Sequence, residues 1–201
     1  MGFTRAELIG FRGKTLPDLL GPDVRLLIVG INPGLLTVAV QSHFGRRGNR
    51  FYPALYRAGI VDRLIDASEG FAEDDRAHLI ARGVGITNLV RAATARADEL
   101  STEELRAGAR SLEKRVRKIK PGTVAMLGIT AYRSAFNRPK AVIGLQPEPL
   151  GGAPLWVVPN PSGLNAHATL DGLAAAYREV AIAAGIDVLD PPAGDQPFRR
   201  Q

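Results

Sequence analysis

The sequence predicts an α/β protein, a three-layer α/β/α sandwich around a central, mostly parallel sheet of about four to five strands. Short apolar runs that end in glycine, proline or asparagine are typical of strands buried on both faces. Segments with helical spacing of apolar residues separate these runs, and such alternation indicates βαβ units. With 201 residues, 45% of them hydrophobic, we expect one domain over residues 1–190, followed by a flexible polar tail at 191–201.

Four apolar runs are the expected strands. The three clearest are VRLLIVG at 24–30, GTVAMLG at 122–128 and PLWVVPN at 154–160, and a weaker run is GVGITNLV at 83–90. In parallel sheets flanked by helices, ligands bind beyond the carboxyl ends of the strands. The loops that follow these runs are therefore where we expect a site.

Helical patterns fill the intervals between the strands. The clearest begins at Ser101, which forms a capping box with Glu104, and it ends at Pro121-Gly122. Another begins at the potential N-cap Thr169. The expected helical segments are 49–66, 71–83, 101–122, 129–136 and 169–185.

Composition excludes several classes of site. The chain has no cysteine, so disulfides, thiolate zinc sites and iron–sulfur clusters are ruled out. Its three histidines lack metal-ligand spacing, and we expect neither a metal nor a cofactor. Lysine and arginine outnumber acidic residues by 26 to 20, and the net charge of +6 favours a polyanionic partner such as nucleic acid. No apolar run is long enough for a membrane span and no secretory signal is visible, so we expect a cytoplasmic protein.

The loop GINPG at 30–34 places an amide on a rigid turn where an apolar strand ends. It lacks the glycine patterns of both nucleotide-binding loops. Pro33 disfavours helical geometry at Asn32, and Gly34 permits close approach. The amide could therefore face a cleft, or it could bond only its own loop as an Asx turn.

The loop VVPNPSGLNAH at 157–167 repeats this arrangement of an apolar strand followed by Asn-Pro and glycine. Two Asn-Pro turns should thus lie at the same edge of one sheet. Ser162 has no Gly-x-Ser-x-Gly context, which argues against a serine hydrolase.

Four motifs occur in order over residues 24–180: GINPG, HFGRRGNRFY at 43–52, GITNLV at 85–90 and NPSGLN at 160–165. This set resembles the mismatch-specific uracil/thymine-DNA glycosylase family of the uracil-DNA glycosylase superfamily. The resemblance implies a monomeric, nucleoid-associated enzyme of base excision repair that works without metal or cofactor. Such an enzyme flips uracil, thymine or ethenocytosine mispaired with guanine out of double-stranded DNA and leaves an abasic site.

The resemblance assigns catalysis to Asn32. A carboxamide is no general base at neutral pH, but its oxygen can accept a hydrogen bond from water and direct that water at C1′ of the deoxyribose. The bond to the base then breaks early, and backbone N–H groups of Ile31 and its neighbours stabilise the departing base.

The implied base pocket comprises Ile31, Gly34, Thr37, His43, Phe44 and Asn88. Phe44 would stack on the extruded base, and Asn88 would pair with the pyrimidine edge. Phe44 could instead be plain core and Asn88 another strand-end turn, and His43 either lines the pocket or faces solvent.

The implied intercalation loop comprises Asn160, Pro161, Ser162, Gly163, Leu164 and Asn165. An apolar side chain such as Leu164 fills the gap left by a flipped base. Relatives often continue with serine and arginine where this chain has Asn165-Ala166-His167, which places guanine recognition in question. Arg46, Arg47 and Arg50 are expected to contact phosphates, whereas the basic cluster at 113–120 reads as a solvated helix end.

Two rival functions stay open. One is a sibling glycosylase that acts mainly on uracil in single strands or on hypoxanthine. The other is a non-catalytic module that binds mismatches or abasic sites, although a pure binder would have little use for Asn32 on its turn.

Overall fold

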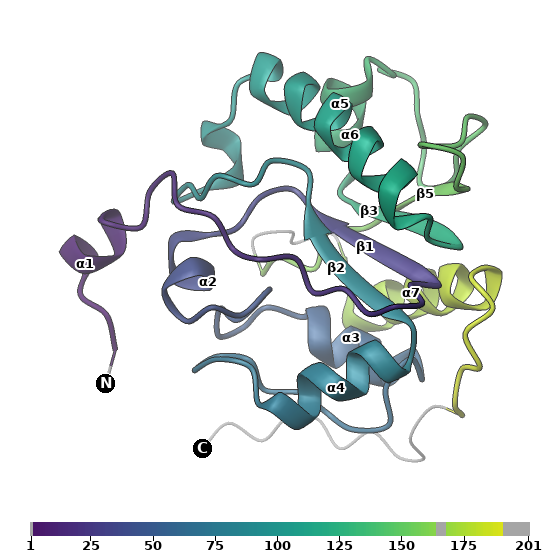
Figure 1. Ribbon diagram of the computed structural model, residues 1–201, viewed down its shortest axis with the longest axis horizontal. Coiled ribbons are helices and arrows are strands. Elements are labelled where there is room, and N and C mark those ends of the chain that lie inside the picture. Colours follow the sequence, from purple (N-terminus) through teal and green to yellow (C-terminus); the bar gives the residue numbers. More distant parts are fainter. Residues whose placement is uncertain (1, 164–167, 191–201) are drawn as a thin grey trace.

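The computed structural model describes residues 2–163 and 168–190, and its core is a five-stranded sheet with the order β2-β1-β3-β5-β4 (Figure 1). Four strands run parallel, and the short edge strand β4 is antiparallel to β5. The predicted mostly parallel sheet is thus confirmed. The strands are β1 (Leu26–Gly30), β2 (Val84–Asn88), β3 (Thr123–Leu127), β4 (Gly144–Leu145) and β5 (Leu155–Val158).

Helices cover both faces of the sheet, which confirms the α/β/α layering. In Figure 1, α5 and α6 lie over one face, and α3, α4 and α7 lie over the other. The helices are α1 (Arg5–Ile9), α2 (Leu35–Ala39), α3 (Phe51–Arg57), α4 (Glu73–Ala81), α5 (Thr102–Ile119), α6 (Ile129–Phe136) and α7 (Leu170–Ala183), with a 3₁₀ turn η1 (Ala97–Glu99).

Alternation along β1 builds two apolar cores. Leu26 and Ile28 pack with α3 and α7, whereas Leu27 and Val29 pack with α5 and α6. All five residues of β1 are buried, as expected for a central strand covered on both faces. Burial of this strand fixes its register, and its carboxyl end therefore holds the following loop rigidly.

Two helical predictions have clear outcomes. The capping box of α5 is confirmed, because Ser101 Oγ accepts from the Glu104 N–H at 3.1 Å and Glu104 bonds back. The helix expected over 49–66 was too long, since α3 ends at Arg57. Gly59 adopts φ +72°, and a Cβ there would lie 2.1 Å from the Leu189 carbonyl oxygen. The left-handed backbone at Gly59 ends the helical path, and the close approach of the Leu189 carbonyl leaves no room for a side chain there.

Three short elements were not predicted: α1, α2 and β4. Each has five residues or fewer, too few for a periodic pattern to be visible in the sequence. The expected tail at 191–201 lies outside the described residues. Across the described residues, no helix is both long and apolar enough to cross a lipid bilayer.

Candidate active site

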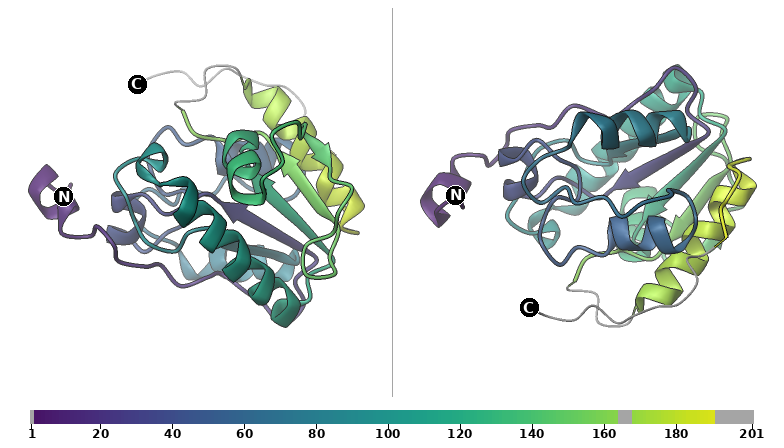
Figure 2. Two further views of the ribbon diagram at one scale, coloured as in Figure 1. Left: turned by 90° about the horizontal axis from the view of Figure 1, so that it is seen from above. Right: turned by 90° about the horizontal axis from the view of Figure 1, so that it is seen from below.

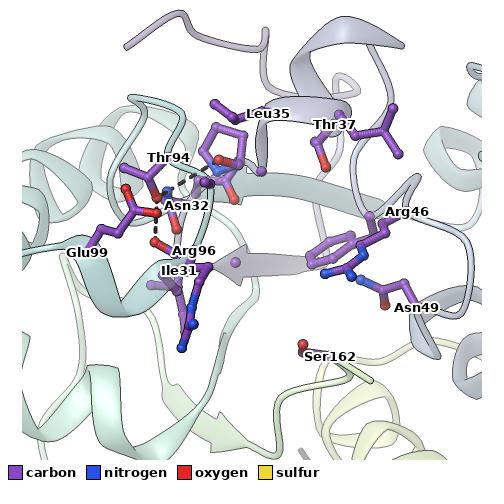
Figure 3. A pocket seen from close by; sticks show the side chains of 18 of the residues that line it. Ile31, Asn32, Leu35, Thr37, Arg46, Asn49, Thr94, Arg96, Glu99 and Ser162 are labelled. Carbon is purple, nitrogen blue, oxygen red and sulfur yellow. Dashed lines mark hydrogen bonds between the residues drawn. The ribbon is translucent and has the colours of Figure 1, made fainter. Parts of the chain in front are cut away.

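A cavity of about 950 Å³ opens at the carboxyl ends of β1 and β2 (Figure 3). Figure 2 shows the arrowhead of β1 directed toward this end of the molecule. The cavity gathers residues from loops that are far apart in the sequence, as parallel strands require. Ten expected site residues line it: Ile31, Asn32, Gly34, Thr37, His43, Phe44, Arg46, Asn88, Asn160 and Ser162.

The amide of Asn32 has a fixed orientation. Its Nδ2 donates to Thr94 Oγ1 at 2.7 Å, and it lies 3.3 Å from the Pro33 carbonyl oxygen and 3.4 Å from that of Ala92. Thr94 Oγ1 donates its own proton to the Arg96 carbonyl oxygen at 2.7 Å. Thr94 must therefore accept from Asn32, so all three neighbours of Nδ2 are acceptors.

This arrangement leaves Asn32 Oδ1 as the free end of the amide. No hydrogen bond from a described residue reaches Oδ1, while the residue itself lines the cavity (Figure 3). An amide oxygen with two lone pairs can accept from a bound water. The alternative of an Asx turn that bonds only its own loop does not describe Asn32, since its shortest bond is to Thr94.

Sequence reasoning missed Thr94. It lies 62 residues after Asn32 in the segment RAATAR, which carries no motif of its own. The fold brings it in through a parallel bridge to Gly34 and a bond from the Thr94 N–H to the Pro33 carbonyl oxygen at 3.3 Å. No local signal reveals such a contact.

The loop after β1 also presents backbone donors. Among the described residues, no hydrogen bond uses the N–H of Ile31, although its carbonyl accepts from the Val90 N–H at 2.9 Å. Gly34 begins α2 at φ −73°, where any residue is allowed, and a Cβ there would meet its first neighbour, Thr37 Oγ1, at 3.7 Å. Glycine at 34 is therefore not demanded by the backbone, and its missing side chain keeps the cavity open.

Asn88 ends β2 directly opposite Gly30 of β1. The residue is 6% exposed and lines the cavity, and no hydrogen bond within the described residues uses its side-chain amide. Its carbonyl oxygen accepts from Arg115 Nη2 at 2.7 Å, which holds the backbone in place. A Cβ on Gly30 would lie 2.6 Å from Asn88 Oδ1 and 3.3 Å from Phe44 Cζ, so glycine at 30 makes room for both side chains.

Phe44 packs against the core and also lines the cavity. Its ring stacks on Phe51 with centroids 3.9 Å apart and planes inclined by 27°. The residue adopts φ +57°, a left-handed conformation that costs a non-glycine residue on the order of 1 kcal/mol and is common at functional sites. Core packing and cavity lining are thus combined in one ring.

His43 is buried and lines the cavity, so of the two expected alternatives the one in which it faces solvent is wrong. It is 3% exposed, its Nε2 donates to the Pro17 carbonyl oxygen at 3.0 Å, and its own carbonyl accepts from Tyr52 Oη at 2.8 Å. Burial lowers its pKa from 6.5 to about 4. The imidazole is therefore neutral at physiological pH.

The three arginines expected to contact phosphate lie in different places. Arg46 lines the cavity, and the exposed Arg47 lies 3.5 Å from Glu69. Arg50 differs from the expectation: its guanidinium donates to the carbonyl oxygens of Ser162 at 2.8 Å, of Pro161 at 3.4 Å and of Ala168. Because Arg50 precedes α3 beside the loop after β5, its charge is used to hold that loop.

The loop after β5 is a second polar turn at the cavity. Asn160 Oδ1 accepts from the Ser162 N–H at 3.0 Å, and Pro161 is buried. Gly163 is exposed, and a Cβ on it would lie 3.3 Å from the Gly48 carbonyl oxygen. The expected wedge residues Leu164 and Asn165 lie outside the described residues. Nowhere in 2–163 and 168–190 do three His, Asp or Glu side chains gather as metal ligands.

Fold and cavity together define a class of protein, namely α/β proteins with a polar ligand site at the carboxyl edge of a parallel sheet. Residues 17–182 match the model of the uracil DNA glycosylase superfamily. The chain belongs to this superfamily, and hence to the DNA glycosylases, hydrolases that act in DNA repair.

A solved structure shows the same fold. It is the solution NMR structure of a protein described as a candidate uracil DNA glycosylase from Methanosarcina acetivorans, with a TM-score of 0.57 and 16% sequence identity. The match covers 86% of this chain and 98% of that chain. The family model confirms the expected family at the level of the superfamily, and this structure shows the shared fold.

Proposed function

We propose that the protein is a monofunctional, mismatch-specific DNA glycosylase. It hydrolyses the N-glycosidic bond of uracil mispaired with guanine in double-stranded DNA, with thymine and ethenocytosine as further candidate bases. The observation that carries this proposal is the orientation of the Asn32 amide, whose Nδ2 is held by three acceptors while Oδ1 is left for water.

The reaction follows from what Asn32 can and cannot do. The bond between C1′ and the base breaks first, and its electron pair leaves with the base. Water held by Asn32 Oδ1 then adds to C1′, and its proton passes to solvent or to the departed base. Since the amide takes no proton, its contribution is positional. The Ile31 N–H, which no described backbone oxygen uses, is a donor for the charge that builds on the base.

Phe44 and Asn88 suit the recognition of a flipped base. The Phe44 ring, backed by Phe51, offers a flat apolar surface for stacking. The Asn88 amide offers one acceptor and two donors to a pyrimidine edge. Because Gly30 lets both side chains approach the end of β1, a base that enters the cavity would meet them together.

The test is a cleavage assay on defined DNA. Duplexes with guanine opposite uracil, thymine or ethenocytosine are incubated with the protein, as are single strands with uracil or hypoxanthine, and alkali then cuts abasic sites. We expect product from the guanine–uracil duplex and none with Asn32→Ala, which should still bind the duplex. The loss for Asn32→Ala should be at least a hundredfold, typical of removing a positioning group.

Two outcomes would change the proposal. Preferred cleavage of single-stranded uracil or hypoxanthine would assign the sibling activity, for which the cavity of about 950 Å³ has room. No product from any substrate with the protein in excess, together with tight binding of the mismatched duplex, would assign a binding module.

A further inference from the structure

Helix α1 stands apart from the sandwich and yet lines the cavity. Figure 1 shows it projecting from the body, and Figure 2 shows it at the end toward which β1 points. None of its residues is buried. Leu8 and Phe11 attach it to a small core cluster around Leu35 and Val38, so the helix is fixed by one side.

Exposed residues in α1 and just before it are both apolar and basic. Ile9 is 55% exposed and Phe3 is 41% exposed, with the Phe3 ring held edge-on against Phe11 at 5.9 Å. Arg5 is exposed and, in the described part of the chain, has no acidic partner. Single exposed apolar side chains are common on protein surfaces. What distinguishes Ile9 and Arg5 is that both also line the cavity.

The cavity continues from Asn32 to this helix. Its wall includes Arg5, Leu8, Ile9 and Arg12, and Arg12 is held toward the mouth by an ion pair with Glu99 at 2.7 Å. A volume of about 950 Å³ is near the upper end of the range for sites that enclose a whole drug-sized ligand, roughly 300–1,000 Å³. The cavity therefore holds more than a single base ring.

The helix is preformed for binding. Thr4 Oγ1 accepts from the Glu7 N–H at 3.3 Å, and the Glu7 carboxylate accepts from the Thr4 N–H at 2.7 Å. These bonds lower the pKa of Glu7, so the carboxylate stays charged and occupied by the cap. The Glu7 carboxylate is used by the cap and forms no ion pair with Arg5, so the Arg5 guanidinium is left to contact a ligand at the cavity.

We propose that α1 is a docking surface for the DNA strand that carries the flipped nucleotide, with Arg5 pairing with a backbone phosphate and Ile9 lying against a neighbouring sugar or base. This inference rests on the proposed function, because the cavity must hold a nucleotide for its strand to pass α1. Charge complementarity and the continuous wall from Asn32 to Arg5 identify the occupant.

Fluorescence anisotropy tests the docking surface. The probe is a duplex with a tetrahydrofuran abasic-site analogue opposite guanine, titrated with the full-length protein over a series of KCl concentrations. We expect Arg5→Gln to weaken binding severalfold and to reduce the slope of log K against log salt by about 0.9, the value for one lost phosphate contact. Arg5→Lys should keep the slope.

The matched control is Lys118→Gln. Lys118 is exposed near the end of α5, just before β3 begins, and so lies toward the amino ends of the strands. Its replacement by glutamine changes the net charge by the same amount as Arg5→Gln. We expect wild-type affinity and slope for this variant. Equal effects of Arg5→Gln and Lys118→Gln would overturn the docking surface, as would a dimer in sedimentation that Ile9→Ser dissociates, because a second copy would then cover α1.

This assay and the cleavage assay fail separately. A protein that cleaves no base but loses affinity through Arg5→Gln would support the docking surface and contradict the proposed function. A protein that cleaves the mismatched duplex, with affinity and salt slope unchanged in Arg5→Gln, would support the proposed function and contradict the docking surface.

Discussion

The Thr94 hydroxyl is the nearest of the three acceptors that orient the Asn32 amide. Thr94 Oγ1 has one proton, and the Arg96 carbonyl oxygen takes it. Its lone pair is therefore left for Asn32 Nδ2. Without that acceptor only the two longer contacts, to the Pro33 and Ala92 carbonyl oxygens, would oppose a half-turn of the amide that presents donors in place of Oδ1 to a water. Thr94 is thus a positioning residue.

Substitution of Thr94 tests this role. Thr94→Val has nearly the same shape but cannot accept, and we expect its single-turnover rate on the guanine–uracil duplex to fall by about one to two orders of magnitude, equivalent to about 1.4 kcal/mol per factor of ten. Thr94→Ser keeps the hydroxyl and should restore most of the rate. DNA affinity should change little in both variants.

The single-turnover rate and the DNA affinity of both Thr94 variants decide the outcome together. Equal rates for Thr94→Val and Thr94→Ser would contradict the positioning role. A loss of affinity as large as the loss of rate would point to a general disturbance of the loop instead.

At the scale of elements, Arg50 joins the start of α3 to the loop after β5. Its guanidinium donates to carbonyl oxygens on both sides of residues 164–167, at Ser162 and at Ala168. A charged donor shared by several backbone carbonyls stabilises a turn more than a neutral one would. The loop that follows β5 is therefore attached to the basic segment that follows α2.

Arg50→Met should destabilise the fold. Hydrogen bonds to charged groups contribute roughly 1.5–3 kcal/mol each, and partial exposure of this site reduces the total, so we expect a loss of about 2 kcal/mol in the free energy of unfolding. Urea denaturation measures it. The control is Arg47→Met, whose ion pair with Glu69 is exposed on both sides and should contribute less than about 0.5 kcal/mol. Equal free energies of unfolding for the two variants would show that the hydrogen bonds from Arg50 to the loop after β5 do not stabilise the fold.

For the whole molecule, burial of His43 couples stability to pH. Its folded pKa is about 4, below the value of 6.5 expected when the chain is unfolded. Between these values the unfolded chain binds the extra proton, so stability is fully present above about pH 6.5 and is lost as the pH falls toward 4. The difference corresponds to about 3 kcal/mol at most.

His43→Gln isolates this contribution. Glutamine does not titrate, and its amide can still donate to the Pro17 carbonyl oxygen. We expect the wild type to lose about 2 kcal/mol more than the variant between pH 7.5 and pH 4.5, measured by urea denaturation at both values. If both proteins lost the same free energy of unfolding between these pH values, His43 would not be the group that lowers stability at acid pH.

The sequence was most informative where a pattern is local. Apolar runs located the four parallel strands, and Pro33 placed Asn32 on its turn at the end of β1. Contacts across the fold stayed hidden, as for Thr94 and for Arg50, whose charge suggested phosphate before its carbonyl partners were visible. Helix α1 was missed because five residues show no period, although three of them, Arg5, Leu8 and Ile9, line the cavity.

Gly30, which ends β1, determines how closely two side chains of the cavity approach the sheet. Because Gly30 carries no side chain, the Asn88 amide and the Phe44 ring reach into the space that a Cβ would fill, while the Gly30 carbonyl oxygen accepts from the Leu89 N–H at 2.8 Å. Peptide groups locked into a sheet yield far less than side chains, which can change rotamer. A larger residue at position 30 would therefore have to displace both side chains, because the peptide at the end of the sheet cannot move aside.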